Sequence, residues 1–194
     1  MFSRNKYSEV FLIKTNDRNF GIKKIFEKID LKDYYGKTIA LKANFNSADP
    51  FPASTHIDTL ENIVKILKEA KVKDIVLAER SGMGKTRDVL EEVKVFDLSK
   101  KLGFKVVVLD EESKDKWVKI KRNGTHWLNG FYISKIFLNA DKVIQTCCLK
   151  THRFGGHFTM SLKNSIGMVA KRVPRGLYDY MVELHTSPFQ RLMI

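Results

Sequence analysis

Short apolar runs of strand length alternate with segments of helical spacing along most of the chain. The runs occupy residues 10–13, 37–45, 74–78, 104–110 and 141–150. Between two of them, one helical stripe is formed by Leu60, Ile63, Val64, Leu67 and Ala70. Buried strands that alternate with helices indicate a mainly parallel sheet covered on both faces. We therefore expect a three-layer, Rossmann-like α/β fold.

The ends of the expected helices carry recognisable signals. Thr55, with Asp58 three residues later, predicts the start of the helix that holds the apolar stripe. Thr86 is expected to cap a further helix that runs to Lys101, and Gly103 to end it. Residues 111–130 are polar and contain both tryptophans, so they predict a small hairpin or an excursion from the sheet.

Length and hydrophobicity favour one α/β domain over residues 1–194. Hydrophobic residues make up 43% of the 194, which suits a globular interior. No run approaches the roughly 18 apolar residues of a membrane span, and the apolar N-terminal stretch is too short for a signal peptide. We expect a cytoplasmic protein with no membrane association.

The charge balance leaves a nucleic-acid partner open as an alternative. The net charge is +13, from 35 Lys and Arg against 22 Asp and Glu. Residues 150–175 contain basic residues and no acidic one, which concentrates the positive charge. Only Phe154 and Phe158 offer base-stacking rings there, so this alternative ranks second.

The loop at residues 79–86, ERSGMGKT, resembles a nucleotide-binding P-loop at its end only. The pattern G-x-x-x-x-G-K-[ST] requires glycine where Glu79 stands. A carboxylate at the mouth of such a loop would repel phosphates, because the loop binds them with inward-pointing backbone N–H groups. We therefore do not expect an ATP or GTP site of this type.

Four loops follow the expected strand ends and hold most of the unusual polar residues: 43–56, 79–86, 110 onward and 147–159. Ligands of open α/β sheets bind outside the carboxyl ends of the strands. Lys150, Arg153 and Lys163 would hold an anion there. We assign His152, Glu79 and Lys150 to acid–base chemistry. The expected ligand-binding set is Lys42, Asn44, His56, Ser81, Thr151, Arg153, Ser161, Lys163 and Asn164.

A metal site is an open alternative in the same region. His152 and His157 are imidazole ligands, and Cys147 or Cys148 could add a thiolate, which would suit a soft-to-borderline ion. The two cysteines are adjacent and no C-x-x-C pair exists, so the chain carries no self-contained iron–sulfur motif.

The motifs ALKANF, STH, AERSG, LKTH and SLKNSIG occur in the order and spacing of a known family. On these segments the chain resembles the family of domain of unknown function 362 (DUF362), over about residues 37–185. Many members are labelled iron–sulfur proteins because a ferredoxin-like module accompanies the domain, and this chain lacks that module. The resemblance extends distantly to the nickel-cofactor lactate racemase group. Ala43 replaces the usual proline, and Cys147-Cys148 stands at an often proline-containing strand end.

Family members usually continue beyond the equivalent of residue 194, so the resemblance implies a fragment or a shortened gene that could self-associate. The leading hypothesis is an α/β protein that binds an anionic small molecule or cofactor, with redox or racemase-like chemistry. The alternatives are a nucleic-acid-binding protein and a subunit of an iron–sulfur electron-transfer assembly, with a redox partner protein.

Overall fold

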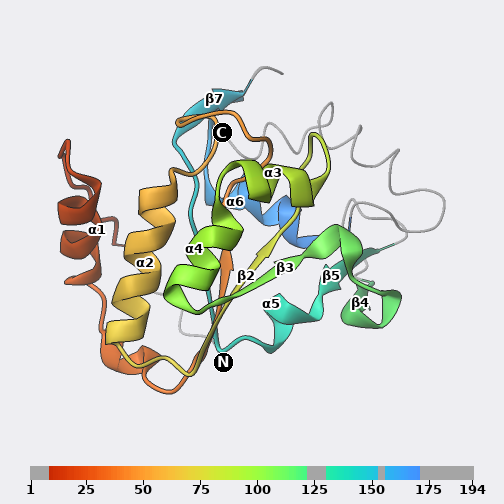
Figure 1. The fold of residues 1–194 in the computed structure, drawn as a ribbon, viewed down its shortest axis with the longest axis horizontal. Helices are drawn as coiled ribbons and strands as arrows, with labels where there is room; N and C mark the ends of the chain where they lie inside the picture. Colours follow the sequence, from red (N-terminus) through yellow and green to blue (C-terminus); the bar gives the residue numbers. More distant parts are fainter. Residues whose placement is uncertain (1–8, 122–129, 153–155, 171–194) are drawn as a thin grey trace.

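A four-stranded parallel sheet forms the centre of the protein. The structure is a computed structural model, and it describes residues 9–121, 130–152 and 156–170. The strands are β1 (Thr38–Lys42), β2 (Asp74–Glu79), β3 (Lys105–Val108) and β6 (Lys142–Gln145), in the order β3-β2-β1-β6 (Figure 1). Every neighbouring pair is parallel, which confirms the predicted mainly parallel α/β fold.

Helices cover one face of this sheet and build the larger core. They are α1 (Arg18–Phe26), α2 (Ile57–Glu69), α3 (Thr86–Glu92) and α4 (Val95–Leu102); α1, α2 and α4 lie on the same side in Figure 1. The predicted stripe of α2 is buried, with Leu60, Val64 and Leu67 at 0% exposure. They pack against Ile39, Leu41 and Leu77 of the sheet. Burial of this stripe is the main stabilisation of α2.

Shorter elements cover the other face. They are α5 (Lys135–Asn139), α6 (Ser161–Asn164) and the 3₁₀ turn η4 (Ser165–Met168). A second apolar cluster forms there from Ala40 and Ala78 of the sheet, Phe137 of α5 and Met168 of η4. Small alanines on the strands leave room for the larger side chains that pack on them.

Two antiparallel hairpins extend from the sheet. The predicted excursion is confirmed as β4 (Trp117–Ile120) paired with β5 (Phe131–Ser134), and β7 (Lys150–His152) pairs with β8 (Gly156–Thr159). The remaining short elements are the 3₁₀ turns η1 (Leu31–Tyr34), η2 (Leu109–Glu111) and η3 (Lys114–Lys116). Among the described residues, no helix has the length and apolarity needed to cross a bilayer.

Four local predictions were wrong. Residues 10–13 form no strand, and Val10 and Leu12 are 87% and 91% exposed, because no strand of the described residues pairs with this run. The cap of α2 is His56, whose Nδ1 accepts from Asp58 N–H at 3.2 Å, one residue after Thr55. The helix expected from Thr86 to Lys101 is divided into α3 and α4 at Lys94, which has φ +63°. Thr86 is the first residue of α3 and not its cap, because Lys85 occupies the N-cap position.

Candidate functional site

The strand order reverses between β1 and β6, and we call the place outside the carboxyl ends of these two strands the crevice between β1 and β6. The chain moves from β1 to β2 to β3 in one direction and then places β6 on the opposite side of β1. Ligands of open α/β sheets bind at such a reversal point, outside the carboxyl ends of the strands. The residues there are Lys42 at the end of β1, and Gln145 and Thr146 at the end of β6. Most of the predicted site residues meet at this edge.

Lys42 and Glu79 form a buried ion pair next to the crevice. Their side chains are 3% and 0% exposed, and Lys42 Nζ donates to Glu79 Oε1 and to the Ala43 carbonyl. Glu79 Oε1 also accepts from the Arg80 N–H at 2.9 Å. The sequence assigned Glu79 to acid–base chemistry without naming a partner, and its ion-pair partner in the structure is Lys42.

Burial moves both groups toward their neutral forms. Desolvation raises the pKa of Glu79, against the attraction of the Lys42 charge and the backbone N–H groups of Arg80 and Phe45. Desolvation lowers the pKa of Lys42, and the charge of Glu79 opposes this shift. Glu79 Oε2 makes no hydrogen bond of good geometry with the described residues, although the Phe45 N–H is near enough to act on the carboxylate. Two groups with convergent pKa values can share or pass a proton.

The turn formed by α6 and η4 closes over this pair. Asn164 Nδ2 donates to the Lys42 carbonyl at 3.2 Å and lies 3.4 Å from Gln145 Oε1 and from the Thr146 carbonyl, so it joins the ends of β1 and β6. A Cβ atom on Gly167 would lie 2.5 Å from Lys42 Cε and 2.9 Å from Nζ. The turn can therefore approach the buried lysine only because position 167 has no side chain.

Asn44 and His56 have structural partners in the loop between β1 and α2. The Asn44 N–H donates to the Thr55 hydroxyl at 3.0 Å, and the Thr55 N–H donates to the Asn44 carbonyl at 2.9 Å. The Thr55 hydroxyl also lies 3.2 Å from that of Thr146, which connects this loop to β6. The hydroxyl that we expected to cap α2 thus fastens the loop to the crevice.

Ser81 and Gly82 hold the loop after β2 against the loop after β1. The buried Ser81 hydroxyl donates to the Phe45 carbonyl at 2.6 Å, and the Gly82 N–H donates to Asn46 Oδ1 at 3.0 Å. A Cβ atom on Gly82 would lie 2.2 Å from Asn46 Oδ1, so the contact requires glycine. These bonds give the Glu79–Gly82 segment a defined position beside the ion pair.

The strand end that precedes the β7–β8 hairpin places two cysteines near the same edge. Cys148 Sγ lies 3.3 Å from the Ser54 carbonyl, and Cys147 Sγ lies 3.4 Å from the Ser161 hydroxyl. Lys150 Nζ donates to the Ala53 carbonyl. Desolvation raises the pKa of the Cys148 thiol, although the charge of Lys150 opposes the shift. Lys150 and Cys148 therefore lie against the loop after β1, as expected for one site.

Lys163 of α6 is a cation with no counter-charge among the described residues. It is partly buried, and it forms no hydrogen bond or ion pair with the residues that the structure describes. Desolvation lowers its pKa, and the charge of Lys150 lowers it further. Two like charges near each other in a partly desolvated place favour the binding of an anion.

Arg80 is a site residue that the sequence reasoning missed. It is 7% exposed, its Nη2 donates to the Ile166 carbonyl at 3.0 Å, and its buried Nε has no partner in the described part of the chain. Burial lowers the pKa of its guanidinium, while Asp110 and Glu79 favour the charged form. An arginine directly after a strand is usually solvated, so only its place between two site loops could have indicated its burial.

Part of the predicted site cannot be placed. Arg153 and the side chains of His152 and His157 lie outside the described residues, and Thr151 is exposed. Among the residues that are described, no group of three or more His, Cys, Asp or Glu side chains could hold a metal ion. The metal alternative, with His152, His157 and Cys148 as candidates, stays a prediction.

Comparison with known proteins identifies the family. Residues 39–194 match the family described as Domain of unknown function (DUF362), which is most of the chain. The chain therefore belongs to this family, as the motifs in residues 37–185 predicted. No curated protein and no solved structure gives a significant match.

Proposed function

We propose that this member of the DUF362 family binds an anionic small molecule or cofactor at the crevice between β1 and β6. The observation that supports it most directly is Lys163, a partly buried cation with no carboxylate partner in the described part of the chain. Lys150, which lowers the pKa of Lys163, would be the second positive charge on the ligand. Asn164 fixes the position of α6 and hence of Lys163.

An anion would compensate the charge of Lys163, which has no carboxylate partner among the described residues. Keeping an ammonium group partly desolvated beside another cation costs free energy, and proteins retain such arrangements mainly at functional sites. The buried guanidinium of Arg80, which forms no ion pair with a described carboxylate, adds positive potential to the same edge. A carboxylate or phosphate group fits this environment, because both accept several charge-assisted hydrogen bonds.

The Lys42–Glu79 pair would supply proton transfer next to the bound anion. Its two groups have pKa values that burial moves toward each other. Such a pair can take a proton from a ligand and return it, as racemase-like or redox chemistry requires. In this proposal Lys163 and Lys150 bind the ligand, while Glu79 and Lys42 act as the proton acceptor and donor.

Binding of simple anions tests the proposal. The probes are inorganic phosphate, pyrophosphate and malonate, titrated by calorimetry into the wild-type protein and into Lys163→Ala. Loss of one charge-assisted hydrogen bond, about 1.5–3 kcal/mol, should weaken the affinity roughly 10- to 100-fold. Lys100→Ala is the matched control, because Lys100 is exposed on α4 and its loss changes the net charge equally. Equal affinity in Lys163→Ala and Lys100→Ala would disprove the assignment.

A nucleic-acid partner is the second candidate, supported by the net charge of +13. Binding through phosphate contacts falls steeply with salt and is reduced only slightly by any single lysine substitution. A mobility-shift assay with RNA and DNA at low and at physiological salt distinguishes the two candidates. Retention that persists unchanged in Lys163→Ala and disappears with salt would favour nucleic acid over the crevice ligand.

A further inference from the structure

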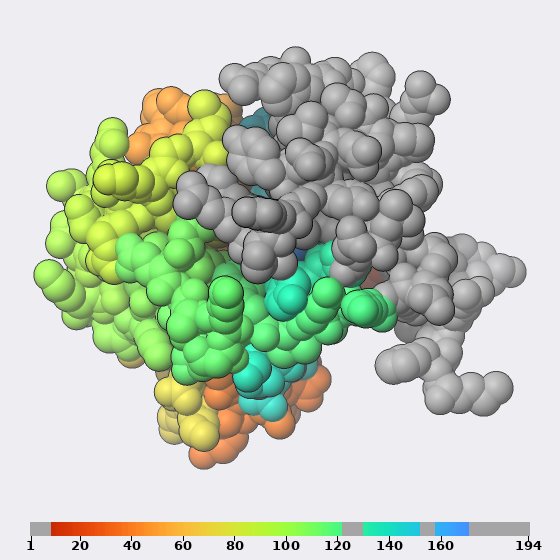
Figure 2. Space-filling view, turned by 90° about the vertical axis from the view of Figure 1, so that its right-hand side faces the viewer, coloured from red at the N-terminus to blue at the C-terminus, as the bar shows by residue number. Residues whose placement is uncertain are grey.

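A cavity lies at the carboxyl ends of β2 and β3, on the opposite side of β1 from β6. Its volume is about 790 Å³, within the range of small-molecule sites. Four segments line it: the loop and first turn of α3 (84–88), the end of β3 with η2 (108–112), the β4–β5 hairpin, and Ala170. Figure 2 shows the surface of residues 105–120 meeting that of β5 on this face.

The elements around this cavity form a β-α-β unit with a glycine-containing first turn. β2 is followed by Gly82-Met83-Gly84, then by α3 and α4, and then by β3, which is parallel to β2. Gly84 has φ +79°, as the tight turn requires. Acidic residues follow the second strand at once, beginning with Asp110. In dinucleotide-binding folds the acidic residue at this place binds the ribose hydroxyls.

The objection that Glu79 would repel a ligand at this loop does not hold in the structure. Its carboxylate is 0% exposed, is paired with Lys42, and does not line the cavity. The loop therefore presents Gly84, Lys85 and Thr86 to the cavity, and the Glu79 carboxylate is not among the lining groups. The sequence still departs from a P-loop, so no phosphate-binding loop of that type is implied.

Two aromatic side chains form one wall. Trp117 and Tyr132 both line the cavity and are half-buried. In the β4–β5 register Trp117 faces Ser134 and Lys119 faces Tyr132, which puts both rings on the same face of the hairpin. Aromatic residues placed diagonally across two strands can reach each other and a shared ligand. A planar heterocycle can stack there, with stacking energies of roughly 1–3 kcal/mol per base.

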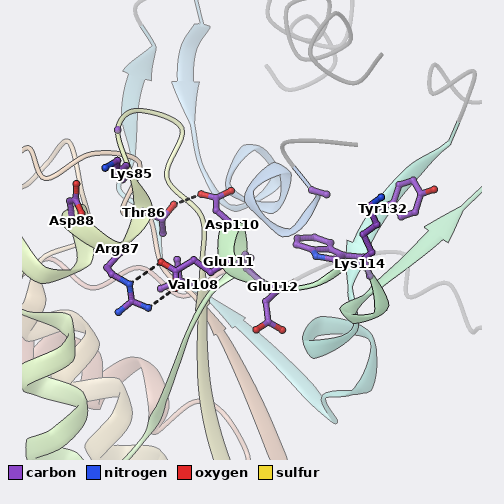
Figure 3. Close-up of a pocket in the computed structure, with 14 residues that line it drawn as sticks. Lys85, Thr86, Arg87, Asp88, Val108, Asp110, Glu111, Glu112, Lys114 and Tyr132 are labelled. Atoms are coloured by element: carbon purple, nitrogen blue, oxygen red, sulfur yellow. Dashed lines mark hydrogen bonds and ion pairs between the residues drawn. The ribbon is translucent and has the colours of Figure 1, made fainter. Parts of the chain in front are cut away.

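The opposite wall holds an acceptor in a fixed position. The Thr86 hydroxyl accepts from the Ser81 N–H at 2.9 Å and donates to Asp110 Oδ2, while Arg87 binds both oxygens of Glu111 at 2.8 and 2.5 Å (Figure 3). Asp110 is exposed, and its Oδ1 accepts no hydrogen bond from the residues described. Thr86 therefore orients Asp110 and leaves one carboxylate oxygen available to hydroxyl donors.

We propose that this cavity binds the nucleoside part of a small molecule. The base stacks on Trp117 and Tyr132, and the 2′- and 3′-hydroxyls of the ribose donate to Asp110. The lining contains four carboxylates (Asp88, Asp110, Glu111, Glu112) and three cations (Lys85, Arg87, Lys114), so it offers acceptors as well as positive charge, unlike the crevice between β1 and β6. The ligand is either a free nucleoside or the nucleoside end of a nucleotide.

The test uses Trp117 as the reporter. Trp127, which lies outside the described residues, is replaced in a Trp127→Phe protein, so Trp117 is the remaining tryptophan. Adenosine, guanosine, cytidine and uridine are titrated while tryptophan fluorescence is recorded, and equilibrium dialysis gives the affinity independently. Adenosine 5′-monophosphate and inorganic phosphate are titrated in the same way. At least one nucleoside should bind saturably and change the fluorescence, and phosphate alone should produce no change.

Asp110→Asn then tests the role of the carboxylate, because asparagine keeps the size and can still accept from Thr86. It should weaken the nucleoside about tenfold. In the parent protein, the 2′-deoxynucleoside should bind more weakly than the ribonucleoside. In Asp110→Asn, the two nucleosides should bind with equal affinity. Asp97→Asn, an exposed position on α4 away from the cavity, is the matched control.

If the monophosphate binds more tightly than the nucleoside, the ligand is a nucleotide. If the two bind with equal affinity, the ligand is a free nucleoside. Failure of all four nucleosides and the monophosphate to bind at millimolar concentration would overturn the proposal. The proposal would also be overturned if the affinity were unchanged both by Asp110→Asn and by removal of the 2′-hydroxyl from the nucleoside.

Discussion

Glu79→Gln should destabilise the fold by leaving Lys42 charged and unpaired in the interior. Lys42 is 3% exposed, and its remaining hydrogen-bond partner would be the Ala43 carbonyl. Holding a lysine of unfolded pKa about 10.4 neutral at pH 7 costs about 4.6 kcal/mol, which limits the penalty because the lysine can lose its proton instead. Breaking a buried pair by removing one partner costs about 3–5 kcal/mol, so we expect a loss in that range.

The pH dependence of the loss has a sign that identifies the cause. In Glu79→Gln, the pKa of Lys42 in the folded state is lowered below its unfolded value, so the unfolded state binds more protons between the two values. The destabilisation should therefore shrink as pH rises toward about 10.4, by up to about 1.4 kcal/mol per pH unit. Lys42→Met should behave in the opposite way. The pKa of the remaining Glu79 is raised in the folded state, so that variant should be stabilised as pH falls toward about 4.3.

Urea unfolding followed by circular dichroism, between pH 5 and pH 9.5, measures both effects relative to the wild type. An unchanged m-value would confirm that the comparison is between equivalent transitions. The double variant Lys42→Met/Glu79→Leu replaces the pair with apolar side chains and should lie within about 2 kcal/mol of the wild type, with little added pH dependence. Single variants that unfold within about 1 kcal/mol of the wild type, or that share one pH slope, would refute the reasoning.

Two glycine substitutions test the contacts around the pair. Gly167→Ala should cost about 1–3 kcal/mol in urea unfolding, because its Cβ would enter the space of the Lys42 ammonium group, and the cost should shrink in a Lys42→Met background. Gly82→Ala should cost about 1–3 kcal/mol by displacing Asn46 Oδ1 from the Gly82 N–H, and Asn46→Ala should remove most of the added cost. Strictly additive free energies in either double variant would contradict the proposed contact.

The parts of the fold that sequence predicted are those determined by local pattern. The spacing of Leu60, Val64 and Leu67 predicted α2 because each of them must be buried on one face of a helix. Residues 10–13 have an equally apolar pattern and form no strand. Apolar character indicates burial in a sheet only when a neighbouring strand supplies hydrogen bonds, and that depends on the rest of the chain. The same limit explains His56 in place of Thr55 as the cap of α2, since Thr55 is used in a contact with Thr146.

The candidate site shows a comparable division. The rule that ligands bind at strand ends led us to predict from sequence that Lys42, Glu79 and the α6 residues lie at one edge of the sheet. The same rule could not predict which of these residues contact one another. Glu79 is neighbour to Arg80 in sequence, and its ion-pair partner Lys42 lies on an adjacent strand, which only the sheet order reveals. Arg80 was missed for the same reason, because its burial comes from η4, which contacts it through the Ile166 carbonyl.

The loop that resembles a P-loop shows how one misplaced side chain alters the interpretation of a motif. From sequence, Glu79 is an acid at the entrance of a glycine-rich turn, and that argues against an ATP or GTP site of the P-loop type. In the fold the strand carries Glu79 into the interior, where Lys42 neutralises it, and the turn begins only at Ser81. Asp110, which lies 31 positions after Glu79 along the chain, is the carboxylate that the Thr86 hydroxyl of the Gly-Lys-Thr ending contacts. The sequence motif alone excluded the loop because of the Glu79 charge, whereas in the structure Glu79 is buried beside Lys42 and Asp110 lines the cavity, so the two carboxylates belong to the two different sites that we propose.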